Sequence, residues 1–119
     1  MLGGVSYSLR TDALPPPLPD AVRTALSDLE IQRALGTLPG WARRGDTLQK
    51  TFTMRTFAEV ILLFNRVATE AERANHHPDI DIRYTKVTFT LSTHDAGGIT
   101  TSDLSLAREI ERLAVESGL

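Results

Sequence analysis

The protein has three histidines in its 119 residues, and all three lie between Glu72 and Asp103. They are His76, His77 and His94. Histidine can both donate and accept a proton near neutral pH, because its ordinary pKa is about 6.5. Together with the two carboxylates, these residues predict a small site that works by general acid–base catalysis.

Glu72 and His76 stand four residues apart in a segment with a helical pattern, so we expect them to share one helix face within contact range. A carboxylate in that position can fix which ring nitrogen of the imidazole carries the proton. His76 and His77 are about 100° apart on an ideal helix, so their side chains should diverge. His94 can join them only if the next strand folds back past the helix end.

Other interpretations of these residues stay open. Three histidines and a carboxylate can in principle ligate zinc, although adjacent histidines diverge and no two histidines stand four residues apart. Taken alone, His77 also fits a partner for the dipole at a helix C-terminus. Asp103 alone fits a capping acid in the first turn of a helix. The spacing of the whole set favours the proton-transfer site and predicts no metal.

Composition narrows the class of protein. The net charge of −2 and the pI near 5.9 do not indicate the excess of basic residues that is typical of nucleic-acid-binding proteins. The absence of cysteine excludes disulfides, thiol catalysis and cysteine-ligated zinc. No segment has the apolar length of a signal peptide core or a membrane span. We therefore expect a cytoplasmic protein that binds neither nucleic acid nor membrane.

The proline-rich stretch at 15–19 cannot enter a helix interior or a central strand, so residues 1–20 are expected to be a flexible leader. Residues 21–119 have the length of one domain. Within it, Ser27 and Glu30 form a capping-box pattern that predicts a short helix. A hairpin should follow, with its first strand starting at Trp41, a turn at 44–47, and Leu48, Phe52 and Met54 facing inward from the return strand.

A second capping box, Thr56 and Glu59, opens the strongest helical pattern, which Pro78 is expected to end. Its apolar stripe is predicted to be Phe57, Val60, Ile61, Phe64, Val67, Ala68 and Ala71.

Apolar residues then change phase from even to odd positions, which predicts a bulge or corner near Thr85 and Lys86. His94 should end the following strand on its polar face. A last helix should start near Thr100, with Asp103 three residues on. The order α-β-β-α-β-β-α predicts a two-layer α+β domain, with helices on one face of an antiparallel four-stranded sheet.

The residues Glu72-x3-His76-His77-Pro78, Tyr84, His94 and Asp103 resemble the signature of the pterin-4a-carbinolamine dehydratases. The similarity extends over roughly residues 27–116. It implies an enzyme that dehydrates 4a-hydroxytetrahydrobiopterin or a related 4a-hydroxytetrahydropterin, within tetrahydrobiopterin metabolism, to a quinonoid dihydropterin and water. By the same resemblance the reaction needs no metal and no cofactor. The proton-transfer residues would be His76 and His94, and the substrate-binding residues His77, Glu72, Asn75 and Asp103.

The resemblance also implies partners. Members assemble as homodimers or homotetramers, and an aromatic amino-acid hydroxylase would supply the substrate. The alternative function is a non-catalytic interaction or dimerisation protein on the same fold. Two departures from the family pattern bear on substrate preference: Ile80 stands where an aromatic residue is expected, and Asn75 stands where some members carry aspartate.

Overall fold

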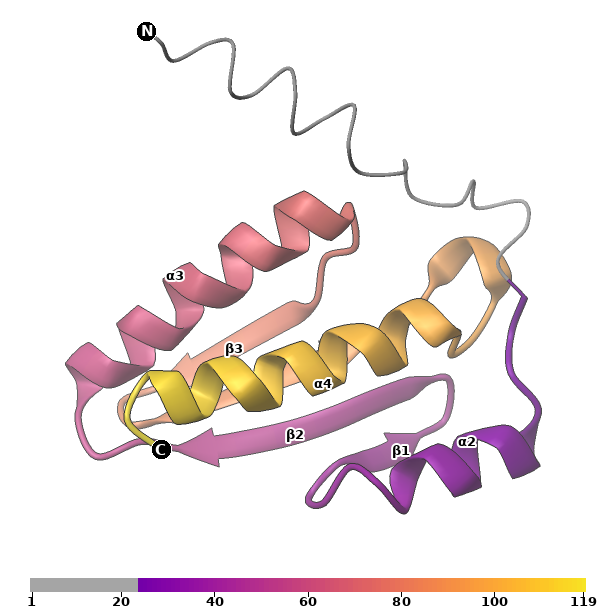
Figure 1. Cartoon of the computed structure of the whole chain (residues 1–119), viewed down its shortest axis with the longest axis horizontal. Helices are drawn as coiled ribbons and strands as arrows, with labels where there is room; N and C mark the ends of the chain where they lie inside the picture. The colour runs from indigo at the N-terminus through magenta and orange to yellow at the C-terminus, as the bar shows by residue number, and fades with distance from the viewer. Residues whose placement is uncertain (1–23) are drawn as a thin grey trace, which may run out of the picture.

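Two central strands, β2 and β4, with apolar residues at alternate positions, organise the fold. They lie in one antiparallel sheet with the strand order β1-β2-β4-β3, and the helices cover one face of it (Figure 1). The computed structural model describes residues 24–119. Its elements are α2 (Asp28–Leu35), β1 (Ala42–Arg44), β2 (Thr47–Thr53), α3 (Phe57–Ala74), β3 (Asp79–Arg83), β4 (Lys86–Leu91), η2 (a 3-10 helix, His94–Ala96) and α4 (Thr101–Glu116).

The predicted α+β class, the four strands and the order of the elements are confirmed, with η2 as an addition. The flexible leader expected at residues 1–20 lies outside the described residues. The core lies between the sheet and the helices. Cross-strand register pairs Leu48 with Leu91 and Phe52 with Val87, and all four side chains are buried. The spacing of two predicted for the return strand is therefore confirmed.

Trp41 anchors the segment before β1 against the core, and the strand that was expected to start at Trp41 begins one residue later. Its indole N–H donates to the Glu111 carboxylate of α4, with 2.8 Å between Nε1 and Oε2. Lys50 lies on the inward face of β2, 4.6 Å above the Phe52 ring, and its ammonium group donates to the same carboxylate at 2.6 Å. The Trp41 indole and the Lys50 ammonium group therefore connect the β1–β2 part of the domain to Glu111 of α4.

Helix α3 begins as predicted, with the Thr56 hydroxyl accepting from the Glu59 N–H. The reciprocal half of the capping box is absent, because the Glu59 carboxylate accepts from the N–H of Arg55. The stripe buried on α3 contains Leu63 in place of the expected Phe64, and Phe57 is 49% exposed. The expected stripe was therefore wrong in part, because it included the exposed Phe57 and omitted the buried Leu63.

The phase change between β3 and β4 arises from a tight hairpin. The turn lies at Tyr84 and Thr85, and Tyr84 adopts a left-handed backbone with φ 55°. Ile80 and Ile82 of β3 pair with inward-facing residues of β4, so they pack against the core from an edge strand. The predicted corner is therefore confirmed in position, and its form is a hairpin turn.

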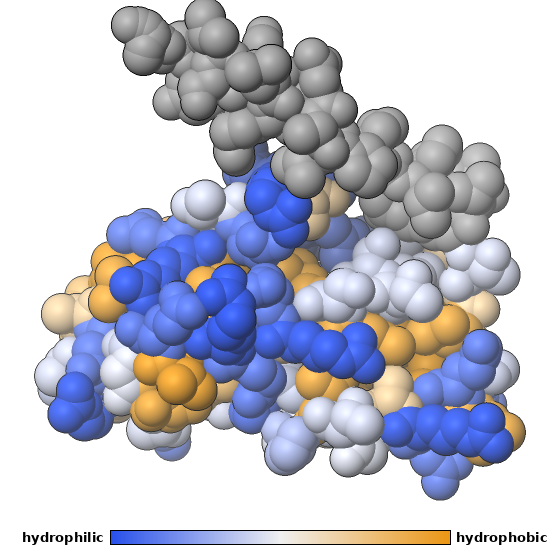
Figure 2. All heavy atoms as spheres, in the orientation of Figure 1, coloured by the Kyte–Doolittle hydropathy of each residue, from blue (hydrophilic) through white to orange (hydrophobic). Residues whose placement is uncertain are grey.

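The surface that carries the helices is chemically mixed. Figure 2 shows hydrophilic side chains over the middle of this face and hydrophobic ones at its left, where α3 begins. Phe57 and Leu62 of α3 are large hydrophobic residues that remain 49% and 41% exposed. Their exposure leaves an apolar surface on α3 that the described residues do not cover.

Candidate active site

The end of α3 decides where the two adjacent histidines point. Asn75 follows the last helical residue and adopts a left-handed backbone with φ 51°. Its N–H returns to the Glu72 carbonyl at 3.2 Å, and the His76 N–H returns to the Ala71 carbonyl at 3.0 Å. This pattern closes a helix with a sharp change of direction, and asparagine tolerates the left-handed position better than most residues. The expectation that Pro78 ends the helix was wrong, because α3 ends at Ala74, four residues before Pro78.

His76 turns inward and bonds a buried carboxylate. Its Nε2 lies 2.5 Å from Oδ1 of Asp103, and the two side chains are only 9% and 0% exposed. The other carboxylate oxygen accepts the Thr93 hydroxyl at 2.8 Å and the Thr100 N–H at 2.9 Å. The Thr93 and Thr100 hydroxyls lie 2.8 Å apart. Asp103 therefore has every oxygen engaged while it also completes the capping box of α4.

His77 turns outward and pairs with Glu72, whose carboxylate contacts its Nε2. The side chains are 55% and 76% exposed. The expected contact between Glu72 and His76 is therefore absent. The left-handed residue at Asn75 breaks the helical spacing on which that expectation depended, and it transfers the Glu72 contact to the next histidine along.

His94 approaches the adjacent pair from the other side of the site. His94 is exposed and is the first residue of η2, whereas β4 already stops at Leu91. The expectation that His94 ends the strand was therefore wrong. A cavity of about 350 Å³ lies between the end of α3 and the segment that follows β4. Its lining contains all three histidines, together with Asn75, Ser92, Thr93 and Asp95.

The structure therefore brings together most of the residues singled out in the sequence. His76, His77, His94 and Asn75 line one cavity. Asp103 is fully buried behind His76 and bonds it directly. Tyr84 lies elsewhere, 75% exposed at the hairpin turn.

Thr93 is a site residue that sequence reasoning did not assign a role. It continues the odd-numbered series of Val87, Phe89 and Leu91, which are buried in the core. A polar residue on an apolar face was the available signal, because a buried hydroxyl needs a hydrogen-bond partner. That partner is Asp103.

Residues 24–119 contain no group of three or more histidine, cysteine or acidic side chains placed to hold a metal ion. In the same part of the chain, no helix combines the length and apolar character that crossing a membrane requires.

Comparison with known proteins places these features in a family. The profile described as pterin 4 alpha carbinolamine dehydratase matches residues 24–113, from just before α2 into the last turns of α4. The chain belongs to the pterin 4 alpha carbinolamine dehydratase family. The matched segment contains every site residue named above.

Curated relatives in this dehydratase family align with the chain along nearly their whole length. A protein from Nocardia farcinica is 56% identical over 89 residues, which cover 75% of this chain and 94% of the relative. One from Roseiflexus is 51% identical over 90 residues, covering 76% and 97%. Both carry the name pterin-4-alpha-carbinolamine dehydratase, marked in each case as a provisional assignment.

Solved structures agree on the fold. A transcriptional coactivator/pterin dehydratase from Brucella melitensis superposes with a TM-score of 0.75 at 29% identity, covering 76% of this chain and 99% of that one. A pterin dehydratase-like protein described as a RuBisCO assembly factor of the alpha-carboxysome superposes with a TM-score of 0.53 at 23% identity, covering 62% and 86%. The second likeness bears on the fold alone.

Proposed function

We propose that this member of the dehydratase family removes water from a 4a-hydroxytetrahydropterin and releases a quinonoid dihydropterin. The observation that carries the proposal is the meeting of His76, His77 and His94 at one cavity. In the reaction the bond between C4a and its hydroxyl oxygen breaks, the leaving oxygen takes up a proton, and a ring N–H gives one up. Two groups that exchange protons near neutral pH suit this chemistry.

His76 is the proposed base. Its Nε2 is engaged by the buried carboxylate of Asp103, so the neutral ring carries its proton there and Nδ1 remains to accept a proton from the substrate. Asp103 is proposed as a positioning residue, because its side chain is fully buried, lies outside the cavity lining and bonds His76. Its bonds to Thr93 and Thr100 hold the carboxylate, and therefore the imidazole, in one orientation.

His94 is the proposed acid, because it is exposed at the opposite wall of the cavity and can take up a proton from solvent. It would give that proton to the leaving hydroxyl. Each histidine is expected to contribute about 10²–10⁴-fold to the rate, as positioned acids and bases do. The proposed reaction requires no metal and no cofactor, and an elemental assay of the purified active protein would test that.

His77 and Asn75 are proposed to bind the substrate, since both are exposed and line the cavity. Glu72 would hold the His77 ring, to which it is paired. Proposed partners are the pterin and a hydroxylase of aromatic amino acids that supplies it. The cytoplasmic location and the place in tetrahydrobiopterin metabolism stay predictions.

A homo-oligomer is part of the proposal, and β3 supports it. Within residues 24–119, this strand lies at an edge of the sheet and pairs only with β4. Antiparallel pairing of two copies about Asp81 would set Asp79 opposite Arg83 and Ile80 opposite Ile82, so pairs of opposite charge and of apolar residues would flank one like-charge pair, Asp81 with its own copy. Light scattering of the purified protein would distinguish a monomer from a dimer or tetramer.

The deciding experiment measures water loss from freshly generated 4a-hydroxytetrahydropterin, with the wild type and with His76→Ala and His94→Ala. We expect acceleration over the uncatalysed reaction, reduced about 10²–10⁴-fold in each variant. Circular dichroism would show that the variants remain folded. A folded wild type that gives no acceleration would refute the dehydratase proposal.

The second candidate is a non-catalytic interaction protein. Exposed Phe57 and Leu62 on α3 favour it, and the Brucella neighbour is described as a coactivator as well as a dehydratase. This alternative predicts that His76→Ala and His94→Ala leave binding of the protein partner intact, whereas charged substitutions at Phe57 and Leu62 abolish that binding.

A further inference from the structure

Tyr84 belongs to the sequence signature but lies far from the histidine cavity of its own chain. It occupies the hairpin turn after β3, whereas His77 precedes that strand, and the extended chain between them spans roughly 20 Å. Its side chain is 75% exposed and its backbone is left-handed, with φ 55°. A bulky residue is unusual in that conformation, which suits glycine or asparagine. The fold of the single chain therefore gives no reason for a phenol ring at this turn.

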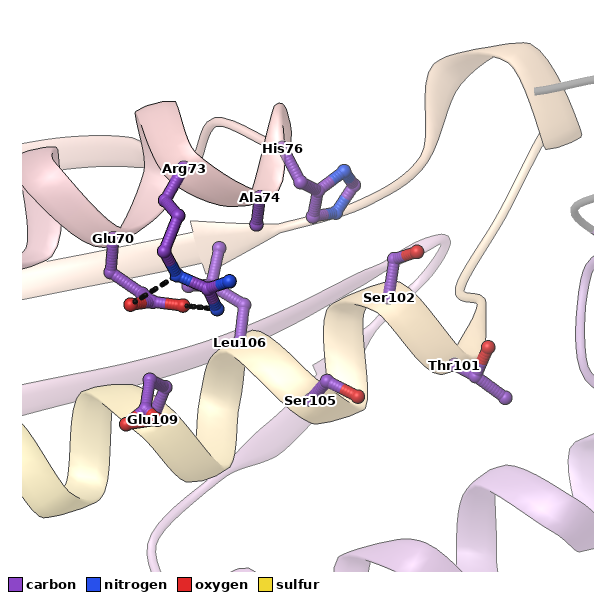
Figure 3. A pocket seen from close by; sticks show the side chains of 9 residues that line it. All are labelled: Glu70, Arg73, Ala74, His76, Thr101, Ser102, Ser105, Leu106 and Glu109. Atoms are coloured by element: carbon purple, nitrogen blue, oxygen red, sulfur yellow. Dashed lines mark hydrogen bonds and ion pairs between the residues drawn. The ribbon is translucent and has the colours of Figure 1, made fainter. Parts of the chain in front are cut away.

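The histidine cavity has no aromatic side chain besides its histidines. Within residues 24–119, its lining is completed by Asn75, Ser92, Thr93 and Asp95. His76 also lines a second cavity, of about 260 Å³, between α3 and α4, and the nine side chains drawn around it in Figure 3 include no phenylalanine, tyrosine or tryptophan. Flat aromatic rings pack favourably against one another. The described part of one chain therefore offers no such surface to the face of a pterin.

The free edge of β3 determines how a second copy can pair with it. Arg83 and Lys86 flank the two-residue turn and pair with each other, so the odd-numbered residues of β3 direct their backbone groups toward β4. Ile80 and Ile82 therefore direct their N–H and C=O groups to the free edge. A two-fold axis at Asp81 sets Ile80 opposite the partner's Ile82, and the two residues then exchange both backbone hydrogen bonds.

The neighbouring registers form fewer backbone hydrogen bonds. An axis at Ile80 places Pro78 at a bonding position, and proline has no N–H to donate. An axis at Ile82 places Tyr84 at a bonding position, where its left-handed backbone does not continue the strand. The axis at Asp81 avoids both defects, although it sets Asp81 opposite its own copy as a like-charge pair. Backbone pairing therefore favours the axis at Asp81.

This register brings the partner's Tyr84 to the start of β3. Counting outward from Asp81, Pro78 lies opposite the partner's Tyr84, and His77 is the residue before Pro78. A two-fold axis perpendicular to the sheet keeps the helices of both copies on one face, the face on which α3 lies (Figure 1). Across a pair of strands, aromatic side chains reach diagonal neighbours at about 7–8 Å. The partner's ring is therefore within reach of the His77 wall of the cavity.

We propose that the site is completed across a dimer of β3 strands, with the partner's Tyr84 packing on the face of the pterin ring beside His77. This inference rests on the proposed dehydratase function. The phenol ring supplies a flat apolar surface, while proton transfer stays with His76 and His94. Substrate binding therefore depends on assembly of the dimer, and each chain supplies a ring to the site of the other.

The interface is tested with single cysteine substitutions, because the chain has no cysteine of its own. Asp81→Cys meets its own copy in a non-hydrogen-bonded pair, where Cα atoms about 4.5 Å apart allow a disulfide. Mild oxidation should give a covalent dimer on a non-reducing gel. Arg83→Cys is the matched control on the same face of the same strand, roughly 14 Å from its copy, and should give none. Any other pattern would overturn the proposed register.

The role of the ring is tested by calorimetry with an unreactive 7,8-dihydropterin. Tyr84→Asn removes the ring and keeps a residue that tolerates the left-handed turn. Binding should weaken about fivefold to tenfold, the range of one aromatic contact. Tyr84→Phe restores the ring and should recover most of that affinity. Equal binding by the wild type and Tyr84→Asn would overturn the inference.

A mixed dimer shows which chain the ring serves. One chain carries His76→Ala and the other Tyr84→Asn, and two different tags isolate the mixed species. If the ring serves the other chain, one site is intact, and below KM the mixed dimer should dehydrate at about half the wild-type rate. If the ring serves its own chain, both sites are defective, and a rate no higher than half that of Tyr84→Asn would overturn the inference.

Cross-linking and calorimetry are read without turnover, so they separate this inference from the proposed function. A wild type that cross-links through Asp81→Cys and binds the dihydropterin through Tyr84, yet dehydrates nothing, would contradict the proposed function and leave the shared site supported. An active wild type whose binding ignores Tyr84→Asn would overturn the shared site alone.

Discussion

Two neighbouring histidines each contact a carboxylate, yet the two pairs lie in opposite environments. The side chains of His76 and Asp103 are 9% and 0% exposed, whereas those of His77 and Glu72 are 55% and 76% exposed. A buried carboxylate with three hydrogen-bond donors cannot relax when one donor is lost, and water cannot replace it. An exposed pair exchanges its partner for water at little cost. The buried pair of His76 and Asp103 is therefore held in one geometry, whereas the exposed pair of His77 and Glu72 can rearrange.

The largest expected effect comes from Asp103→Asn. The amide cannot accept from every donor that now meets the carboxylate, so His76 loses its tautomer control. We expect kcat to fall about 100-fold or more, with a changed pH–rate profile. The free energy of unfolding should fall by about 3 kcal/mol, as it does when a buried pair is broken. Steady-state kinetics measures kcat, and denaturant titration measures the free energy of unfolding. A variant with near-normal kcat would contradict the proposal that the buried pair matters more to catalysis than the exposed one.

Thr93→Val should produce the next largest effect. Valine keeps the shape of threonine but removes the hydroxyl that donates to Asp103. We expect kcat to fall about tenfold and the protein to lose about 1–3 kcal/mol of stability. Thr93→Ser retains a hydroxyl and serves as the control. If the serine variant is as impaired as the valine one, the hydroxyl is not what holds Asp103.

His77→Ala should act mainly on binding. His77 is exposed and lines the cavity without a buried partner. We expect KM to rise about fivefold to tenfold, the range of one net hydrogen bond, with little change in kcat. Steady-state kinetics separates the two constants. A fall in kcat as large as that for His76→Ala would show that the exposed histidine matters as much to catalysis as the buried one, which contradicts the difference proposed between the two pairs.

Glu72→Gln should have the smallest effect. The pair that it breaks is exposed, so the expected loss of stability is below about 1 kcal/mol. Activity should change less than about threefold, and salt should reduce even that difference because it screens surface charges. Kinetics at two ionic strengths checks this. A loss as large as that from Asp103→Asn would show that exposure does not govern the worth of these pairs.

The elements of the fold followed from local signals in the sequence. The Ser27 capping box and the two-residue spacing of Leu48 and Phe52 each depend on neighbours within a few positions, and each was predicted correctly. The boundaries of the inward face of α3 did not follow. Which residues of a helix are buried depends on packing against segments far apart in the chain, and local spacing did not indicate that Leu63 is buried.

The site was predictable as a set of residues and not as a set of contacts. The histidines were identified by their types and spacing. Their partners were not, because a single left-handed residue, Asn75, redirects the chain and gives Glu72 to His77. The partner of His76 comes from 27 positions away. Helical spacing carries no information about a contact of that range.

The contact between Trp41 and Glu111 has a practical consequence for all such variants. Trp41 is the only tryptophan in the chain, it is 6% exposed, and its indole bonds α4 from the segment before β1. Its emission should therefore report one defined position, with a shift to longer wavelength when α4 separates from the sheet and water reaches the ring. None of the substitutions discussed above alters this contact. The protein thus contains its own optical probe of folding, and loss of activity can be compared with loss of structure in a single unlabelled sample.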